Sequence, residues 1–415
     1  MGDTLPTRRV DAVLDGRAFP LLLFLGILLR LAAILGFPVF PLVGNTEDTA
    51  IYDAGARSLA AGLGYQWGGH PTAFFPIGWP LILSLAYRIG GASALSGQLA
   101  NFLFSLVIVA GGWVLGRRLL GARSGRFVAL VLMILPHQVI YPAFLMSETA
   151  FTAFFVSSLA VLASLPNLSS LPKAASVMRL IGAGVLMGAA TLVRGPALVY
   201  PILAGAWAHA GLKARPVTSI LAACLFGFGL FLPIAPWAIR NHRVFDRWVL
   251  AANDGGMNFL MGNHPGATGA RHEPPGGLPD TGDEVADDRE GYRRGVEFIR
   301  QRPLEFLSLL PRKFVRLTVP APLLTYRAEL RAKWPTPVAL SLLTLDQLLH
   351  MALWGLVALA VVRRRHHPAV RFGLLTIGLW VAVHLGFLGG ARYFFPVMPI
   401  LVLVAAAGRF SERDS

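Results

Sequence analysis

An aspartate and a tyrosine in the first long polar stretch of the chain have the residue types and the spacing of a reactive pair. Asp48 and Tyr52 lie four residues apart in the segment from Asn45 to Pro80, and residues four apart share one face of a helix. A carboxylate placed in this way can accept a proton from an attacking hydroxyl group, which is the role of a general base. The competing interpretation is that Asp48 only stabilises the positive end of the helix dipole.

This polar stretch contains the signals of a short helix that would carry the pair. Thr46 is a good N-cap, and Asp48 falls in the first turn, where the helix dipole favours carboxylates. Two glycines, Gly62 and Gly64, provide an exit from the helix. We therefore expect a helix from about residue 47 to residue 61.

Six further polar residues lie at the ends of apolar segments that are far apart in the sequence. Ionisable groups at membrane depth are costly, so several of them at one face of unrelated helices indicate a shared aqueous cavity. Arginines bind phosphate oxygens through charge-assisted and often bidentate contacts, so a phosphate and a sugar are suitable ligands for such a cavity. The candidates for substrate binding, in addition to Tyr52, are Glu148, Arg194, Arg240, Asn263, Arg392 and Tyr393.

These candidates also have structural interpretations that involve no ligand. Glu148 can simply begin a helix that Ser147 caps. An arginine at the end of an apolar helix commonly extends its side chain to water. Asn263 lies between Gly262 and Pro265, in a stretch that suits a turn.

The composition places the chain in a membrane. Of its 415 residues, 55% are hydrophobic and 14% are charged, and the mean hydropathy is +0.59. A chain of this composition has more apolar surface than the core of a water-soluble protein can bury. In such a protein a net charge of +15 indicates basic loops on the cytoplasmic side of the membrane and contact with anionic membrane lipids. No base-reading motif is present, so nucleic acid is not an expected partner. The single cysteine, Cys224, excludes a disulfide framework and a cysteine metal site.

The apolar runs and the basic clusters between them predict an all-α polytopic membrane protein of about ten spanning helices. Both ends of the chain are expected in the cytoplasm, because the clusters of arginine and lysine then all lie inside. The run 78–89 is too short to cross and is expected to be interfacial or re-entrant. The ten expected spans are 19–40, 95–116, 127–141, 149–165, 180–193, 197–211, 217–238, 340–362, 370–388 and 394–407.

This topology divides the chain into three parts. Residues 1–238 form an N-terminal transmembrane module whose first outer loop, residues 41–94, carries the reactive pair. Residues 239–337 form a polar region outside the membrane, and residues 338–415 form the C-terminal spanning helices. This topology places one group of candidates on the outer side of the membrane: Asp48, Glu148, Arg194, Arg240, Asn263 and Arg392.

An ordered set of motifs resembles the GT-C superfamily of polyprenyl-phosphate-dependent membrane glycosyltransferases. The similarity is to the branch of protein mannosyltransferases and lipid A aminoarabinose transferases, often called glycosyltransferase family 39, and it runs from the first helix to the last. The motifs are DTAIYDAGARSLAAGLGY, TAFFPIGWPLILSLAYRIGG, MSETAF, PWAIRN, GGMNFLMGNHPGATG and GGARYFFPVMP.

The resemblance implies roles for several residues. Asp48, with Tyr52 after it, matches the catalytic acid of the first outer loop, Glu148 matches a second acid, and Arg194 matches a basic residue beside the lipid phosphate. Two departures stand out: a double proline is Phe75-Pro76 here, and Asn-Asn-Pro is Asn263-His264-Pro265.

Cofactor use is left open by the sequence. No dedicated metal site is expected from the histidines, which lack the spacing of a helical metal pair. Some members of the superfamily use a divalent cation, and Asp48 with Glu148 could hold one if the fold brings them close.

The expected function is that of an integral membrane glycosyltransferase at the outer face of the plasma (inner) membrane. The donor would be a polyprenyl-phosphate sugar, and the acceptor a hydroxyl group on a glycan, lipid or protein. A single displacement with Asp48 as base would invert the sugar linkage. The alternatives are a multipass transporter or lipid flippase, for which no internal repeat is evident, and a catalytically inactive relative that only binds lipid.

Overall fold

The computed structural model describes residues 13–36, 46–166, 168 and 173–409, and within these it is almost entirely helical. The only strands among the described residues are β1 and β2, which pair as an antiparallel hairpin. The elements are α2 (Ala18–Gly36), α3 (Thr46–Ala60), β1 (Gln66–Trp67), β2 (His70–Pro71), α4 (Gly78–Gly90), α5 (Ala94–Leu120), α6 (Ala122–Ile134), α7 (Pro136–Ile140), η1 (Tyr141–Ala143), α8 (Glu148–Ala163), α9 (Ala174–Val193), η2 (Gly195–Val199), α10 (Pro201–Ala210), α11 (Pro216–Phe245), α12 (Gly255–Gly262), α13 (Glu284–Gln301), α14 (Pro303–Thr318), η3 (Pro322–Tyr326), α15 (Arg327–Lys333), α16 (Thr336–Arg364), α17 (Pro368–Gly386), η4 (Ala391–Val397) and α18 (Met398–Arg409).

The predicted class, an all-α polytopic membrane protein, is confirmed. Within the described ranges, seven helices are long and apolar enough to cross a membrane, and the bent pair formed by 122–134 and 136–143 would make an eighth span. Each of the ten expected segments coincides with a helix in its described residues, and residues 37–40 of the first segment lie outside them. However, α8 is a shorter apolar helix and α10 has only ten residues. The count of about ten spans therefore stays a prediction.

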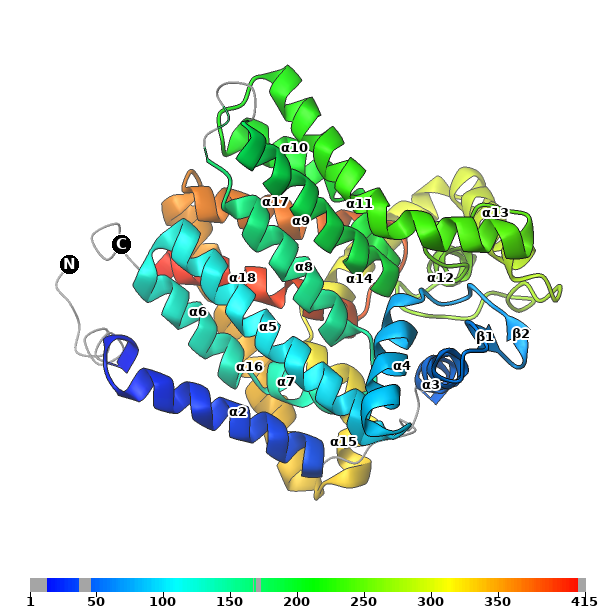
Figure 1. Ribbon diagram of the computed structural model, residues 1–415, viewed down its shortest axis with the longest axis horizontal. Coiled ribbons are helices and arrows are strands. Elements are labelled where there is room, and N and C mark those ends of the chain that lie inside the picture. Colours follow the sequence, from blue (N-terminus) through cyan, green and yellow to red (C-terminus); the bar gives the residue numbers. More distant parts are fainter. Residues whose placement is uncertain (1–12, 37–45, 167, 169–172, 410–415) are drawn as a thin grey trace.

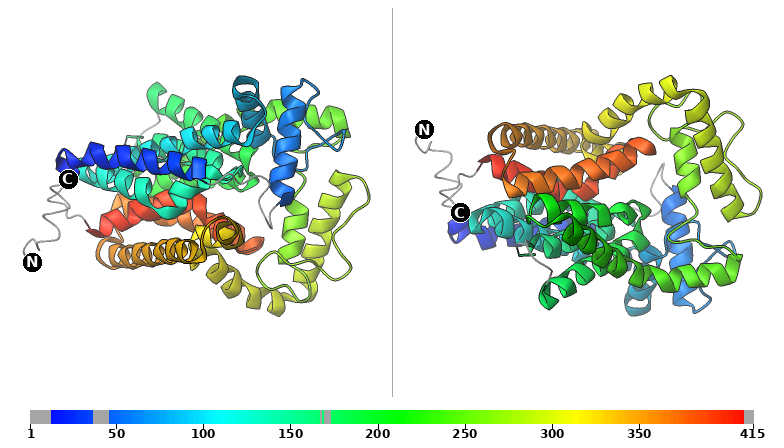
Figure 2. Two further views of the ribbon diagram at one scale, coloured as in Figure 1. Left: turned by 90° about the horizontal axis from the view of Figure 1, so that it is seen from below. Right: turned by 90° about the horizontal axis from the view of Figure 1, so that it is seen from above.

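The spanning helices lie side by side, and the polar elements gather beyond one end of them (Figure 1). We call this group the polar lobe; it comprises residues 46–93 and 246–335, with α3, α4, the hairpin and α12 to α15. In Figure 2, α3, α12 and α13 stand clear of the spanning helices, whereas α4, α14 and α15 pack against them. The start of α2 lies at the opposite end, where Asp15 pairs with Arg123 and Arg126. Arg123 and Arg126 are thus at the end of the bundle opposite the polar lobe.

Glycines allow the closest helix crossing of the bundle. A Cβ atom on Gly184 or Gly188 of α9 would fall 2.1 to 2.2 Å from the backbone oxygens of α11, and one on Gly229 of α11 would fall 2.2 Å from an oxygen of α9. Small residues that let backbones touch are the usual contact of helices in lipid, where burial of apolar surface drives no association. This crossing fixes the end of α9, where Arg194 follows.

One arginine holds the bend between α6 and α7. Arg30 of α2 is fully buried, and its guanidinium donates to the carbonyl oxygens of Leu132 (2.9 Å) and Met133 (2.6 Å). These carbonyls lie in the last turn of α6, and Pro136 at the start of α7 has no N–H to offer them. Arg30 therefore caps the broken helix from a neighbouring one. The bend turns the chain toward the loop that precedes α8.

Candidate active site

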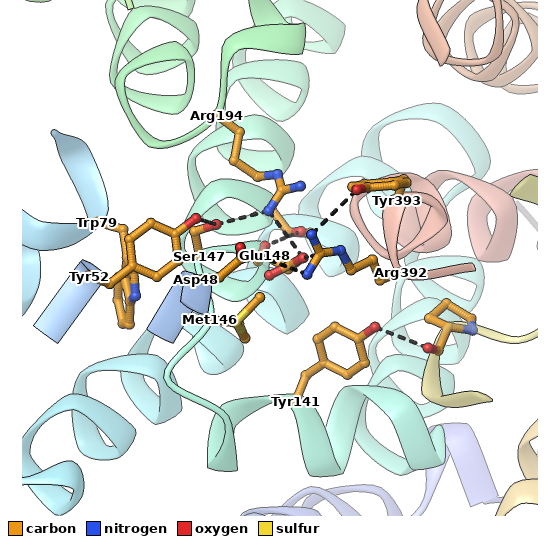
Figure 3. A network of polar contacts seen from close by, with 12 residues as sticks. Asp48, Tyr52, Trp79, Tyr141, Met146, Ser147, Glu148, Arg194, Arg392 and Tyr393 are labelled. Atoms are coloured by element: carbon orange, nitrogen blue, oxygen red, sulfur yellow. Dashed lines mark hydrogen bonds and ion pairs between the residues drawn. The ribbon is translucent and has the colours of Figure 1, made fainter. Parts of the chain in front are cut away.

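Two buried carboxylates and two partly buried arginines meet where four distant segments come together (Figure 3). Asp48 comes from the first turn of α3, Glu148 begins α8, Arg194 follows α9, and Arg392 is in η4. Arg392 Nη1 lies 3.0 Å from Asp48 Oδ2, and Arg194 Nη1 lies 3.1 Å from Glu148 Oε1. A longer contact of 3.9 Å joins Arg392 Nε to Glu148 Oε1. Four of the residues singled out from the sequence are therefore one cluster.

Both tyrosines named from the sequence join this cluster. Tyr393 accepts a hydrogen bond from Arg392 Nη2 at 3.3 Å, and its ring lies beneath the guanidinium groups of Arg392 and Arg194. The hydroxyl group of Tyr52 lies 3.4 Å from Ser147 Oγ, which also accepts a hydrogen bond from Arg194 Nη1 at 2.9 Å. Tyr52 and Tyr393 flank the charges from opposite sides in Figure 3.

Ser147 is a site residue that the sequence suggested only as a helix cap. The structure gives its side chain no capping hydrogen bond to α8; instead the hydroxyl group links Arg194 to Tyr52. The signal in the sequence was its position directly before Glu148. That position is compatible both with a helix cap and with a residue of the site.

The loop before α8 is held by side chains from two other helices. Gln98 and Asn101 of α5 donate hydrogen bonds to the carbonyl oxygens of residues 143, 144 and 146, at 2.8 to 3.2 Å. Trp79 of α4 donates from its indole nitrogen to the carbonyl oxygen of Leu145 at 3.2 Å. Hydrogen bonds to all of these buried carbonyls fix the backbone. The position of Glu148 is thereby set by α4 and α5.

The two arginines point at the carboxylates, and most of each side chain is buried. The side chains of Arg194 and Arg392 are 16% and 13% exposed, and Glu148 is fully buried. Removing one partner of a buried ion pair leaves an uncompensated charge, so the four groups depend on one another. Despite the 3.1 Å approach of Arg194, neither carboxylate oxygen of Glu148 receives a well-directed hydrogen bond. Glu148 therefore retains capacity to accept hydrogen bonds.

Arg240 does not join the cluster. Its guanidinium donates to the backbone oxygens of Tyr65 (3.1 Å) and Thr72 (2.9 Å) and lies 4.9 Å from the ring centre of Trp237. The helix expected to end at residue 238 continues to Phe245, so Arg240 projects from its side. It holds the first polar loop against α11.

Asn263 also lies apart from the four charges. It is fully buried, accepts a hydrogen bond from Lys313 Nζ at 2.8 Å, and donates to the carbonyl oxygens of Phe259 and Gly386. Burial lowers the pKa of Lys313 to about 8. Both residues anchor the backbone that leads from α17 to η4, and so they act on Arg392 from a distance.

The cluster does not fit a metal ion as it stands. Arg392 lies 3.0 Å from Asp48 and 3.9 Å from Glu148, so its positive charge already lies beside both carboxylates. Across the described residues, no group of three or more His, Cys, Asp and Glu side chains could hold a metal. Two carboxylates matched by two arginines also leave no excess negative charge for a divalent cation.

Asp254 is an acidic group beside the cluster that the sequence did not single out. It precedes α12, and Arg194, Asp288 and Asp48 all act electrostatically on its carboxyl group. Burial raises the pKa of Asp254 to about 7; Arg194 opposes this rise, whereas the two aspartates reinforce it. An acid just before the Gly255-Gly256 pair was the signal available in the sequence.

This raised pKa predicts how stability depends on pH. The folded protein retains a proton on Asp254 that the unfolded chain releases above about pH 4, so this group lowers stability as the pH rises from about 4 to 7. Replacement of Asp254 by asparagine is expected to raise the midpoint of thermal unfolding in detergent by several degrees at pH 8 and to leave it nearly unchanged at pH 4. The exposed Asp280, replaced in the same way, is the control; equal midpoints for Asp254→Asn and wild type at pH 8 would contradict the assignment.

Comparison with known proteins bears on the fold. No family model and no curated protein sequence matches the chain. The Archaeoglobus fulgidus oligosaccharyltransferase in its apo form is similar in structure, with a TM-score of 0.57 and 13% identity over 96% of this chain and 51% of that one. The same enzyme with zinc and sulfate gives 0.54 and 14%, over 93% and 48%. ArnT from Cupriavidus metallidurans bound to undecaprenyl phosphate gives 0.41 and 14%, over 93% and 77%.

The similarity to the oligosaccharyltransferase establishes an architecture. The chain spans about half the length of the oligosaccharyltransferase, and identities of 13 to 14% concern the fold alone. The chain therefore has the fold of the Archaeoglobus fulgidus oligosaccharyltransferase, which agrees with the GT-C fold that the ordered motifs predicted.

Proposed function

We propose that this protein is a membrane glycosyltransferase that moves a sugar from a polyprenyl-phosphate donor to a hydroxyl acceptor. The observation that carries the proposal is a set of ion pairs at the polar end of a membrane bundle. They join the buried carboxylates of Asp48 and Glu148 to Arg194 and Arg392. Such groups are costly there and mark functional sites in membrane proteins.

The two arginines are suited to the phosphate of the donor. A phosphate needs compensating charge in a cavity with little water, and arginine offers a planar, permanently charged fork. Entry of the donor would let Arg392 exchange its contact with Asp48 for phosphate oxygens, and Arg194 its contact with Glu148. Each carboxylate would then lose its neutralising partner to the ligand.

Asp48 is the base in this proposal. Once Arg392 turns to the phosphate, the Asp48 carboxylate can accept the proton of the acceptor hydroxyl group as its oxygen attacks the anomeric carbon. The bond from that carbon to the phosphate oxygen breaks, and the lipid phosphate leaves with the bonding electrons. One such displacement inverts the configuration at the anomeric carbon.

A structural neighbour lends support to a lipid phosphate as the ligand. The Archaeoglobus fulgidus oligosaccharyltransferase has been solved with an inhibitory peptide and a dolichol phosphate, and it shares this fold with a TM-score of 0.53. A lipid phosphate suits a bundle whose spanning helices face hydrocarbon. Its prenyl chain can stay in the bilayer while its phosphate headgroup reaches the arginines.

The proposal can be tested on the purified protein in nanodiscs. A panel of polyprenyl-phosphate sugars is supplied together with a solubilised envelope extract, and release of the lipid phosphate is measured with transfer of the labelled sugar. Transfer with release supports the proposal. Movement of intact donor across the bilayer without cleavage would favour a flippase, and binding without either process would favour an inactive relative.

The orientation of the polar lobe is a separate expectation, and the single cysteine makes it testable. In a Cys224→Ala background, Ala61→Cys and Glu273→Cys in the polar lobe should react with an impermeant thiol reagent on intact cells. Arg118→Cys, at the basic end of α5, should react only after the cells are opened. Labelling of the α5 position alone would reverse the predicted orientation and place the cluster on the cytoplasmic side.

A further inference from the structure

Four aromatic rings form a continuous row from the surface of the polar lobe to the charged cluster. The ring centres of Trp67 and Phe74 are 5.9 Å apart, those of Phe74 and Phe75 are 5.0 Å apart, and those of Phe75 and Tyr52 are 5.0 Å apart. The outer end, Trp67, is 46% exposed, and the inner end, Tyr52, is 5% exposed and touches Ser147. We call Trp67, Phe74, Phe75 and Tyr52 the aromatic row.

The row approaches the cluster from the side opposite Arg392. In Figure 3, Tyr52 lies on one side of Asp48 and Glu148, and Arg392 with Tyr393 lies on the other. The hairpin that carries Trp67 belongs to the polar lobe, beyond the ends of α5 and α9 in Figure 1. The row therefore leads toward Asp48 from the polar lobe, and Arg392 lies on the far side of that carboxylate.

The backbone of the row is fixed from two directions. Glu284 at the start of α13 accepts hydrogen bonds from Thr72 Oγ1 at 2.7 Å and from the amide of Ala73 at 2.6 Å. Arg240 of α11 donates to the carbonyl oxygens of Tyr65 and Thr72. A surface held in one geometry before the ligand arrives loses less entropy on binding. By these contacts Arg240 and Glu284 hold the backbone of the row in place before a ligand binds.

A carboxylate lies next to the row. The amide of Asn253 donates to the carbonyl oxygens of Ala73 (2.9 Å) and Phe74 (3.3 Å), so Asp254 follows directly beside Phe74. Asp254 Oδ2 accepts one hydrogen bond from Asn258 at 3.0 Å, and a carboxylate has about four acceptor positions in all. Asp254 also lies close enough to Arg194 and Asp48 to interact with both electrostatically.

We propose that the aromatic row and Asp254 form the binding site for the sugar rings of a carbohydrate acceptor. Sugar rings present apolar C–H faces, which pack on aromatic rings, and hydroxyl groups around their rim, which donate to a carboxylate. A lipid chain would have no use for the carboxylate, and the outer end of the row, Trp67, is exposed on the polar lobe. This inference rests on the proposed function and narrows its acceptor from any hydroxyl group to that of a glycan.

The test measures binding of oligosaccharides to the full-length protein in nanodiscs. Binding is detected by saturation-transfer NMR, and no sugar donor is present. The probes are a panel of neutral oligosaccharides built from glucose, mannose, galactose and N-acetylglucosamine, with short serine- and threonine-containing peptides as competing ligands. We expect saturation of sugar ring protons by the wild type. Trp67→Ala should weaken binding roughly tenfold, Trp67→Phe should retain part of it, and Asp254→Ala should also weaken it.

A matched control is Trp248→Ala, because Trp248 is 64% exposed in the same lobe and its ring stacks on His242, which is not a member of the row. It should bind sugars like the wild type. No saturation transfer to any sugar, equal binding by wild type and Trp67→Ala, or a preference for peptides would each overturn the inference. The measurement involves no turnover: a protein that binds sugars through Trp67 but transfers none would refute the proposed function alone.

Discussion

Replacement of Asp48 by asparagine is expected to lower sugar transfer by roughly 10² to 10⁴-fold, the range that a general base contributes. Asparagine keeps the shape of the side chain and can still accept a hydrogen bond from Arg392 Nη1, which lies 3.0 Å from Asp48 Oδ2. It cannot take a proton at neutral pH. Donor binding should therefore persist while turnover is lost, and both are measured on the same preparation.

Asp53 provides a control on the same helix. Its carboxylate accepts hydrogen bonds from Arg57 and from the hydroxyl group of Tyr87, both at 2.7 Å, and so it only joins α3 to α4. Asp53→Asn should retain most of the transfer activity with reduced thermal stability. Turnover near the wild-type level in Asp48→Asn would mean that Asp48 serves only the helix dipole and its ion pair with Arg392.

Glu148→Gln separates the roles of the two carboxylates. Glu148 pairs with Arg194 and lies 3.9 Å from Arg392, but it is fully buried, so a reacting hydroxyl group has less access to it than to Asp48. A smaller loss of turnover than in Asp48→Asn is therefore the expected order.

The sequence predicted the site residues best where burying a residue of that type costs free energy. Asp48, Glu148, Arg194 and Arg392 are charges at the ends of apolar helices, and the cost of burying charge predicts that they find one another. Their convergence is present in the structure. The helix that carries Asp48 also begins and ends close to its predicted limits, since the glycines after it adopt positive φ angles of 78° and 84°.

The sequence was less informative where backbone atoms are the partners. Arg240 and Asn263 satisfy carbonyl oxygens of Tyr65, Thr72, Phe259 and Gly386, and no pattern of side chains reveals which carbonyls a folded loop leaves open. The continuation of α11 to Phe245 was missed because polar residues near its end resemble a loop. Ser147 has the same appearance as a cap and as a link between Arg194 and Tyr52.

Replacement of Arg194 or Arg392 by alanine is expected to weaken binding of the lipid-phosphate donor roughly tenfold or more. Each substitution removes a charge-assisted contact worth on the order of 1.5 to 3 kcal/mol. Lysine at either position should recover part of the loss, because it restores the charge without the planar fork. The measurement is a titration of each variant in nanodiscs with the polyprenyl phosphate itself, which requires no knowledge of the sugar.

Arg240→Ala is the control that separates phosphate binding from structural support. Arg240 is an arginine of the same polar end, yet its partners are the carbonyl oxygens of the first loop and the ring of Trp237. Its loss should lower the unfolding midpoint and leave affinity for the polyprenyl phosphate near that of the wild type. Since Arg194 and Arg392 also neutralise buried carboxylates, their alanine variants should lose stability as well, so affinity is the deciding quantity. Unchanged affinity in both variants would remove the phosphate site and leave the four charges as a purely structural network of the bundle.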